Sequence, residues 1–284
     1  DYYSTEIYII PSDGGEARPL TDIKGSIDTF SWSPDGKQLL CQVVLTDKED
    51  LEREADETKR KLGVVARDYK RVFYKLDGAG YLGHERTHLW IVDARTGKAR
   101  QLTSHEIYDE RDASWSPDGR QVGVLSNRTD APDFHVDHDD IYEIPAKGGE
   151  MRLIESEPGE KYMPTFSPDG KWIAFYGSAG EGEDWHNMGL WIVPADGSAK
   201  PVNLVKKYDI HANSWTINDI QDPEWMPPTW SVDGQSIYFP VAIHGSSTFN
   251  KVDLKGNNLE AVIPEGGVVG SFSFDRSQEH LAYF

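Results

Sequence analysis

The hexapeptide "WSPDGK", from Trp32 to Lys37, decides the fold, because near copies of it return along the chain. Serine, proline, aspartate and glycine suit the four positions of a type I β-turn, in which proline presets the backbone of the second residue. In each copy the turn follows an aromatic residue and precedes strand-forming residues, so each copy predicts the turn of a β-hairpin. The later copies are "WSPDGR" from Trp115, "FSPDGK" from Phe166, "WSVDGQ" from Trp230 and the degenerate "FDRSQ" from Phe274.

A second hairpin follows the first in each repeat. The stretch "HLWIVDARTGKARQLT", His88 to Thr103, holds an apolar strand, a glycine turn and a shorter strand that ends in Leu-Thr. Each repeat therefore holds four antiparallel strands, A to D, and such repeats around an axis build a β-propeller. We predict an all-β fold of four-stranded antiparallel blades. The related hairpins are "DIYEIPAKGGEMRLI", "GLWIVPADGSAKPVNL" and "TFNKVDLKGNNLEAVI".

The two ends of the chain are out of phase with the repeat. The chain opens with a C–D hairpin, Glu6 to Thr21, and closes with an A–B hairpin, Gly270 to Phe284. Together they predict one blade, which gives about five blades in a single domain, 1–284. We expect the ring to close, because an open segment would expose two sheet faces and associate as a homo-oligomer. The expected blades are 27–103, 109–154, 160–204, 225–263, and 268–284 combined with 4–21.

Tryptophan recurs at one position of the repeat, immediately before the turn. Trp32, Trp115 and Trp230 occupy this position. Large aromatic side chains there would fill the space between neighbouring blades. We therefore expect all three to be core residues.

Strand order separates the long loops from the short turns. The A–B and C–D turns lie at one end of a blade, and the B–C loops and the D-to-A links lie at the other end. Since loops on a rigid scaffold usually carry binding, the second end is the expected functional face. The long excursions are the B–C loops at 47–86, 128–139 and 178–188 and the D–A link at 205–226.

The insertion at 47–86 is the largest excursion and reads as a helix followed by a hairpin. Thr46 and Glu49 predict a capping box, and Gly63 predicts the C-terminal cap. Between these two caps, oppositely charged i,i+4 pairs predict one solvated surface helix. After it, "RDYKRVFYKLDGAGYLGHER" predicts a hairpin around Asp77-Gly78. The three pairs are Glu49/Arg53, Asp56/Arg60 and Glu57/Lys61.

The long loops carry the candidate binding residues. Two interpretations stay open for the insertion: its arginines and tyrosines line the mouth of a substrate channel, or they pack it onto its own blade. Partner contact and local packing stay equally open for the aromatic residues of the later loops, which include Trp215 to Trp225. The candidate channel residues are Arg71, Tyr74, Tyr81, Arg86, Trp185 and His186.

One loop concentrates carboxylates and histidines. The stretch "DAPDFHVDHDD", Asp130 to Asp140, lacks the spacing of a calcium loop, and His135 and His138 have no helical frame to align them on one metal. A solvated loop is favoured over a metal site. The chain also lacks G-x-S-x-G, H-E-x-x-H, P-loop and paired-cysteine patterns. We expect no metal, no cofactor and no catalysis by this chain alone.

Composition excludes several partners. The 284 residues carry 29 basic against 48 acidic side chains, a formal charge of −19, and the basic residues form no long cluster. Nucleic acid and anionic membranes need a positive footprint, so neither is expected as a partner. No apolar run reaches the roughly 18 residues of a membrane span. Cys41 is the only cysteine, so no disulfide can form within the chain. A chain that begins at Asp1 is expected to be processed or a fragment.

The repeats resemble those of TolB-type propellers. The ordered series "RVFYKLDGAGYL", "THLWIVDARTGKARQLT" and "WSPDGRQVGVLSNRTD" resembles the propeller of the prolyl oligopeptidase family, in its acylaminoacyl-peptidase-like branch. This resemblance covers nearly the whole chain. It implies a non-catalytic propeller that caps an α/β-hydrolase domain bearing a Ser-Asp-His triad and admits only short peptides.

This chain departs from that family in two respects. The hydrolase domain is missing, and the strands suffice for fewer blades than the family usually has, as if both ends were cut inside the propeller. No catalytic residue is carried over. The resemblance implies the gating domain of a cytoplasmic serine peptidase. The alternative is a stand-alone five-bladed module that binds a protein or a glycan, and a G-x-S-x-G motif downstream in the gene would discriminate between the two.

Overall fold

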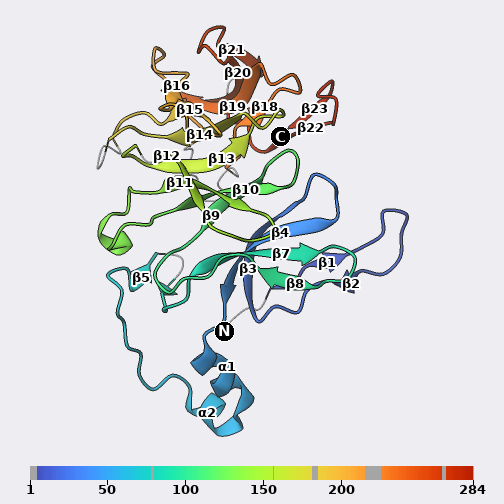
Figure 1. Cartoon of the computed structure of the whole chain (residues 1–284), viewed down its shortest axis with the longest axis vertical. Helices are drawn as coiled ribbons and strands as arrows, with labels where there is room; N and C mark the ends of the chain where they lie inside the picture. The colour runs from blue at the N-terminus through green and yellow to red at the C-terminus, as the bar shows by residue number, and fades with distance from the viewer. Residues whose placement is uncertain are drawn as a thin grey trace. The chain divides into compact units, whose positions relative to one another are not determined.

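The computed structural model describes residues 5–77, 80–155, 157–180, 185–214, 225–263 and 267–283 (Figure 1). Strands dominate it. The chain divides into two compact units, of which the first comprises Asp1–Ala113, Ser126–Val136 and Ala146–Gly148, and the second comprises Ser114–Leu125, Asp137–Pro145 and Gly149–Phe284. Over the described ranges, no helix combines the length and the apolar character needed to cross a bilayer.

The first unit is built on one four-stranded antiparallel sheet, in the order β3-β4-β7-β8. The hairpin β1–β2 joins its core through Ile7 and Leu20, which cluster with Cys41 of β4. Burial raises the pKa of the Cys41 thiol to about 12. The strands are β1 (Tyr8–Ile9), β2 (Arg18–Pro19), β3 (Gly25–Trp32), β4 (Gln38–Leu45), β7 (Thr87–Asp93) and β8 (Ala99–Gln101).

The repeated turn has the expected geometry. In its first copy the Gly36 N–H donates to Ser33 O at 2.8 Å, and Gly36 adopts φ 68°. The Ser33 hydroxyl donates to Asp35 Oδ1 at 2.8 Å and accepts from the Gln38 N–H at 2.9 Å. These bonds tie the turn to the start of β4. The same serine-to-aspartate bond recurs at Ser116–Asp118, Ser167–Asp169 and Ser231–Asp233.

The last two copies of the turn are linked to each other. Valine replaces proline at position 232, so this turn has a free N–H, which donates to Gln278 Oε1 at 3.0 Å. The Gln278 Nε2 donates in turn to Trp230 O at 2.8 Å. Gln278 stands where the other copies have glycine, and it adopts φ 56°. Each copy therefore departs from the repeat at the residue that binds the other.

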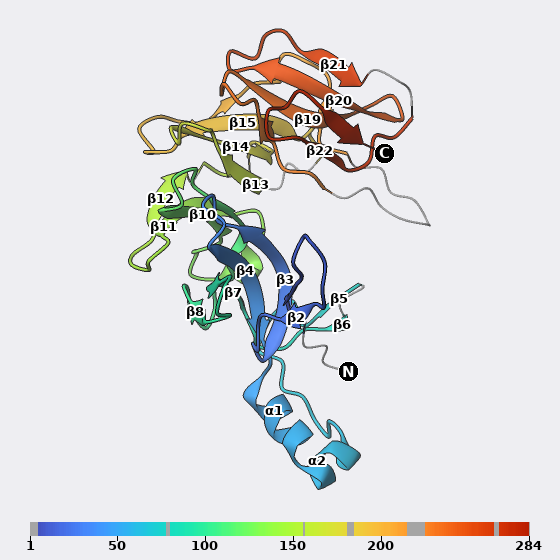
Figure 2. The same ribbon diagram turned by 90° about the vertical axis from the view of Figure 1, so that its right-hand side faces the viewer.

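The insertion leaves the first sheet between β4 and β7, at the end of β4 remote from the Ser33 turn, as the strand order predicts. It holds a helical pair, α1 (Lys48–Ala55) and α2 (Glu57–Leu62), and a hairpin, β5 (Lys75–Leu76) with β6 (Gly80–Tyr81). Figure 2 shows the helices standing clear of the sheet. The predicted hairpin is confirmed by the pairing Lys75↔Tyr81, although Gly78 at its tip lies outside the described residues.

The prediction of one continuous helix was wrong. Asp56 adopts φ −112° and ψ 117°, which ends α1, and its carboxylate accepts from Thr58 N and Lys59 N to cap α2. An aspartate that binds backbone N–H groups competes with helix continuation. The predicted capping box at Thr46 was also wrong, because the N-cap of α1 is Asp47, which accepts from Glu49 N at 2.7 Å.

Of the charge pairs predicted on this helix, Glu57–Lys61 is confirmed at 2.7 Å. Arg53 pairs with Asp50, one turn away, instead of with Glu49. The C-terminal cap at Gly63, with φ 71°, is confirmed. The helical pair is therefore held mainly by its own caps and short-range ion pairs.

The next two sheets follow the order β9-β10-β11-β12 and β13-β14-β15-β16. In both, the long loop connects the second strand to the third, as predicted. The strands are β9 (Arg111–Trp115), β10 (Gln121–Ser126), β11 (Asp140–Pro145), β12 (Arg152–Glu155), β13 (Lys161–Phe166), β14 (Trp172–Gly177), β15 (Gly189–Pro194) and β16 (Val202–Asn203), and the 3-10 helix η1 spans Pro132–Phe134.

The following sheet has the order β17-β19-β20-β21, with β18 also paired to β19. The prediction that 205–226 is only a link was wrong, because β17 lies within it and pairs with Val241 and Ala242. Two strands, β17 from within this segment and β18 from after it, therefore pair with β19. The elements are β17 (His211–Ala212), β18 (Thr229–Trp230), β19 (Ser236–Ile243), β20 (Ser246–Asp253) and β21 (Glu260–Ile263).

The hairpin of β22 (Phe272–Phe274) and β23 (Leu281–Tyr283) packs on this last sheet. Phe272 shares a core with Phe249, and their ring centroids lie 4.1 Å apart. The hairpins β1–β2 and β22–β23 are each two-stranded sheets within their own units. Their combination into one blade stays a prediction.

The repeated tryptophans differ in burial. Trp230 is buried in the core of the second unit and donates from Nε1 to Thr165 O at 3.2 Å, as predicted. Trp115 is half-buried. For Trp32 the prediction was wrong, because this side chain is 50% exposed. In the described part of the first unit only the short β1–β2 hairpin precedes β3, so no earlier four-stranded sheet covers the indole as β13 covers Trp230.

Candidate functional site

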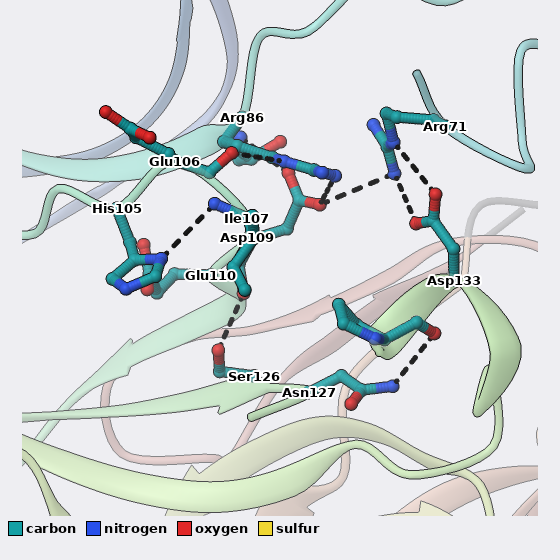
Figure 3. Close-up of polar contacts among 12 residues, drawn as sticks. Arg71, Arg86, His105, Glu106, Ile107, Asp109, Glu110, Ser126, Asn127 and Asp133 are labelled. Carbon is teal, nitrogen blue, oxygen red and sulfur yellow. Dashed lines mark hydrogen bonds and ion pairs between the residues drawn. The ribbon is translucent and has the colours of Figure 1, made fainter. Parts of the chain in front are cut away.

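Two arginines of the insertion meet two aspartates of the first unit, and Figure 3 shows the cluster. Arg71 lies between α2 and β5, and its Nη2 lies 3.1 Å from Asp133 Oδ1 in η1. Arg86 directly precedes β7, and its Nη1 lies 3.2 Å from Asp109 Oδ2. Arg71 Nη2 also lies 4.0 Å from Asp109 Oδ2, so all four side chains form one network. We call these four residues the arginine–aspartate cluster.

The aspartates of this cluster also hold the backbone of the insertion. Asp133 Oδ2 accepts from the Val72 N–H at 3.2 Å, and Asp109 Oδ1 accepts from the Thr87 N–H at 2.8 Å. Burial acts to raise the pKa of the Asp133 carboxyl, but the hydrogen bond and charge of Arg71 outweigh it and hold the pKa below its ordinary value. The cluster therefore fastens both ends of the segment from Arg71 to Arg86.

A second polar network lies beside the first. The completely buried Glu110 has its Oε2 at 2.8 Å from His88 Nδ1, and it accepts from Thr103 Oγ1 at 2.7 Å and from Arg128. An imidazole beside a carboxylate is the arrangement of a general base and its orienting acid. Here His88 Nε2 faces backbone atoms, His105 O at 3.1 Å and His105 N at 3.3 Å. The pair therefore holds the chain in place and presents no base to a nucleophile.

A cavity of about 930 Å³ opens beside these networks. Its lining combines basic side chains and imidazoles with acidic ones, Asp47, Glu85 and Glu106. Arg71 and Arg86 both line it while they bind aspartates, so each guanidinium is fixed in direction at the wall. The two guanidinium groups offer N–H donors to a polar group of a ligand. The lining includes Arg71, His84, Arg86, His88, Gln101 and His105.

The two candidate tyrosines lie together on the insertion hairpin. Tyr74 and Tyr81 both pack against Tyr69, with ring centroids 5.8 Å and 5.6 Å apart. They are 51% and 58% exposed. Lys75 Nζ lies 5.7 Å from the centre of the Tyr81 ring. Among the candidates on the insertion, the structure thus places the arginines at the cavity and the tyrosines in a separate aromatic group on the hairpin.

The remaining candidates belong to the second unit. Trp185 is 73% exposed and packs edge to face with His186, at a ring separation of 5.5 Å. His186 lines a cavity of about 540 Å³ with Asn187 and Asp209, whose side chains hydrogen-bond at 3.1 Å. The predicted aromatic group from Trp215 onward lies outside the described residues, except for Trp225, which packs edge to face on Tyr162.

The carboxylate-rich loop at 130–140 contributes Asp133 to the arginine–aspartate cluster, which is a different role from a solvated loop. Across the described ranges, no three His, Cys, Asp or Glu side chains converge on a point that could hold a metal ion.

Sequence reasoning identified the arginines of the cluster but missed their partners Asp109 and Asp133, and it missed Glu110. One signal was present: Arg71 and Arg86 flank the hairpin part of the insertion, while the next B–C loop is rich in carboxylates. Opposite charges on the loops of consecutive repeats indicate a contact between them. The burial of Glu110 could not be recognised in the same way, because in the sequence it is one of several charged residues that precede a strand.

Comparisons with known proteins show which peptidases and propellers this chain is similar to. No family model matches the chain. It is 28% identical over 283 residues to the uncharacterized peptidase YuxL of Bacillus subtilis, across 98% of this chain and 42% of that protein. The chain thus spans less than half the length of this relative.

The solved structures extend the comparison. The acylaminoacyl peptidase of Pyrococcus horikoshii matches 98% of this chain and 38% of its own, with a TM-score of 0.68 and 17% identity. The β-propeller domain of the Trilobed protease from Pyrococcus furiosus matches 98% of this chain and 66% of its own, with a TM-score of 0.58 and 16% identity. The predicted β-propeller fold of four-stranded blades is therefore confirmed, and so is the resemblance to the propellers of prolyl-oligopeptidase-type peptidases.

Proposed function

We propose that this chain is the propeller portion of a serine peptidase, in which it caps a hydrolase domain and filters peptide substrates by size. One observation carries the proposal: nearly the whole chain matches less than half of a peptidase, and it also matches the propeller domain of a second protease. The catalytic serine, histidine and aspartate would then belong to the rest of the protein.

The insertion supports a filtering role. It is the longest connection between two strands of a blade, and it lies at the end of β4 opposite the Ser33 turn. The arginine–aspartate cluster fixes it beside a cavity of about 930 Å³. A wall that is held at both ends can exclude large substrates and water from a reaction chamber.

A labelling experiment tests the peptidase assignment. A fluorophosphonate probe reacts with an activated serine, so it should label the complete protein to which this chain belongs and should leave the isolated 284-residue chain unlabelled. Labelling of the isolated chain would contradict the proposal, and so would a complete protein that neither reacts with the probe nor hydrolyses peptides.

A second experiment tests the filter. The complete protein should cleave tripeptides faster than long peptides, and it should not cleave folded proteins. Asp133→Asn should raise the rate on long peptides relative to tripeptides, because it loosens the insertion at Arg71 and Val72. Asp68→Asn is the matched control, since the Asp68–Lys70 ion pair is exposed on the same insertion. Rates that are independent of peptide length would reject the size filter while leaving the peptidase assignment intact.

A further inference from the structure

A cavity of about 370 Å³ in the second unit carries a separate inference. It lies where the end of β12, the segment that leads to β13 and the loop after β14 meet. Its volume falls in the range of small-molecule sites. Glu155 and Lys161 line it together with the rings of Phe175, Trp191, Pro158 and Pro201.

Glu155 brings an unsatisfied acceptor to this cavity. The residue is 4% exposed, and its backbone ends β12. Its Oε1 accepts from the Glu157 N–H, but Oε2 accepts no hydrogen bond from any described residue. Oε2 lies 3.3 Å from Lys161 Nζ in an ion pair that falls outside hydrogen-bonding geometry. A buried carboxylate oxygen without a donor is unfavourable, so a ligand that supplies one N–H or O–H would be stabilised here.

Lys161 is engaged with the backbone. Its side chain is 4% exposed, and two of its three N–H groups donate, to Glu157 O at 2.6 Å and to Gly159 O at 3.2 Å. The lining holds two glutamates, Glu155 and Glu157, and two lysines, Lys161 and Lys200, so its formal charges balance. A charged ligand would lose its hydration against a lining of balanced charge, so the site favours a neutral ligand.

The apolar wall of the cavity is aromatic. The rings of Phe175 and Trp191 lie 6.4 Å apart at an interplanar angle of 14°. Trp191 Nε1 donates to Gly177 O at 2.9 Å, which fixes the direction of the indole. Pro158 and Pro201 add two further apolar rings. A flat, apolar ring system suits such a wall.

We propose that this cavity binds a small neutral aromatic compound that carries an N–H or O–H donor, with indole as the simplest example. The donor bonds to Glu155 Oε2, and the ring packs on the wall formed by Phe175, Trp191 and the two prolines. The inference is independent of the proposed peptidase function.

The test is a pair of probes in which one carries the N–H donor and the other carries an N-methyl group in its place. Binding of 5-fluoroindole and of 5-fluoro-1-methylindole to the 284-residue chain is measured by fluorine NMR titration. Methylation removes one hydrogen bond to a charged acceptor, so the methylated compound should bind about tenfold more weakly. Equal affinities would overturn the proposal, and so would the failure of 5-fluoroindole to bind, which would mean that only water fills the site.

Two variants locate the site. Ala179→Leu narrows the cavity at an exposed wall position, and it should weaken 5-fluoroindole binding about tenfold while the circular dichroism spectrum stays unchanged. Ala261→Leu is the matched control, because Ala261 is exposed on β21 and does not line the cavity. An equal effect of both variants, or no effect of Ala179→Leu, would overturn the proposal. Glu155→Gln should reduce the difference between the two probes, and an unchanged difference would also count against it.

Discussion

The arginine–aspartate cluster and the group around Lys161 both place carboxylates beside basic side chains, but the carboxyl pKa values shift in opposite directions in the two groups. In the first, Asp109 and Asp133 face two guanidinium groups and two backbone N–H donors. In the second, Glu155 and Asp140 share one lysine, which donates to backbone carbonyls. Burial raises the pKa of Asp140 to about 6 and also raises the pKa of Glu155, with Lys161 opposing both shifts, whereas the pKa of Asp133 is lowered.

The comparison teaches that burial and the supply of donors together decide the sign of a carboxyl pKa shift, since Asp133 is both less buried than Asp140 and Glu155 and better supplied with donors. An arginine fork can serve a carboxylate and still reach another group, while a lysine that donates to two carbonyls acts on a carboxylate mainly through its charge. The first group therefore stabilises the fold at neutral pH, and the second one costs stability there.

The largest effect is expected from Lys161→Met. This change leaves the buried Glu155 and the partly buried Asp140 without their counter-charge, so the free energy of unfolding should fall by about 3 kcal/mol at pH 7.5. The loss should be smaller at pH 5, because both carboxyls have raised pKa values and take up protons. Urea unfolding followed by circular dichroism measures both values. A loss that is the same at both pH values would break the comparison.

Asp133→Asn should lower the free energy of unfolding by about 1 to 2 kcal/mol at pH 7.5, because it weakens charge-assisted bonds. It should also accelerate hydrogen exchange at the Val72 amide, which Asp133 holds. The Thr87 amide, held by Asp109, is the internal reference and should keep its rate. Since the pKa of Asp133 is lowered in the folded chain, this contribution should vanish as the pH falls through that pKa. Equal acceleration at both amides would show that the cluster does not fasten the insertion locally.

Asp140→Asn is expected to stabilise the chain at neutral pH. The carboxyl has a pKa of about 6 in the folded chain against an ordinary value of 3.8, because burial disfavours its charged form, so the folded state binds more protons between these values. Stability is therefore lost as the pH rises through this window, and the penalty is complete above pH 6. After allowance for partial exposure, the variant should gain about 1 kcal/mol over the parent chain at pH 7.5 and little at pH 4. A gain that is equal at both pH values would contradict the origin in burial.

The smallest effect is expected from Lys200→Ala. Lys200 Nζ lies 2.6 Å from Glu157 Oε1, a shorter contact than that between Lys161 and Glu155, but the lysine side chain is 82% exposed. Exposed ion pairs contribute little, so the urea midpoint should not change measurably. A clear shift of the midpoint would mean that the N–O distance, and not burial, determines how much each ion pair stabilises the chain.

The propeller could be predicted from the sequence because the turn motif acts locally. Ser33, Asp35 and Gly36 bind one another and the next strand, so the same four letters give the same corner in any blade. Burial of the tryptophans failed to follow the motif. Trp230 and Trp32 hold the same position in their repeats, but burial depends on what another sheet places over the ring.

Only the arginines of the candidate site could be predicted from the sequence, because the contacts with their partners depend on the folded chain. Arg71 and Arg86 stand out in the sequence because they flank the hairpin of the insertion, whereas their partners lie 62 and 23 residues away. Only the folded chain brings Asp133 to Arg71. The break between α1 and α2 was local and could have been found, because Asp56 is a strong N-cap residue in the middle of the predicted helix.

The bond between Val232 and Gln278 bears on how such a chain can be engineered. Restoring the repeat consensus at the fourth turn would put proline at position 232 and delete the N–H that Gln278 accepts, and restoring glycine at position 278 would delete the acceptor. Replacing both copies by one ideal motif would therefore remove the hydrogen bonds that join these two turns. A design built from identical repeats would have to stabilise the contact between the two turns in another way.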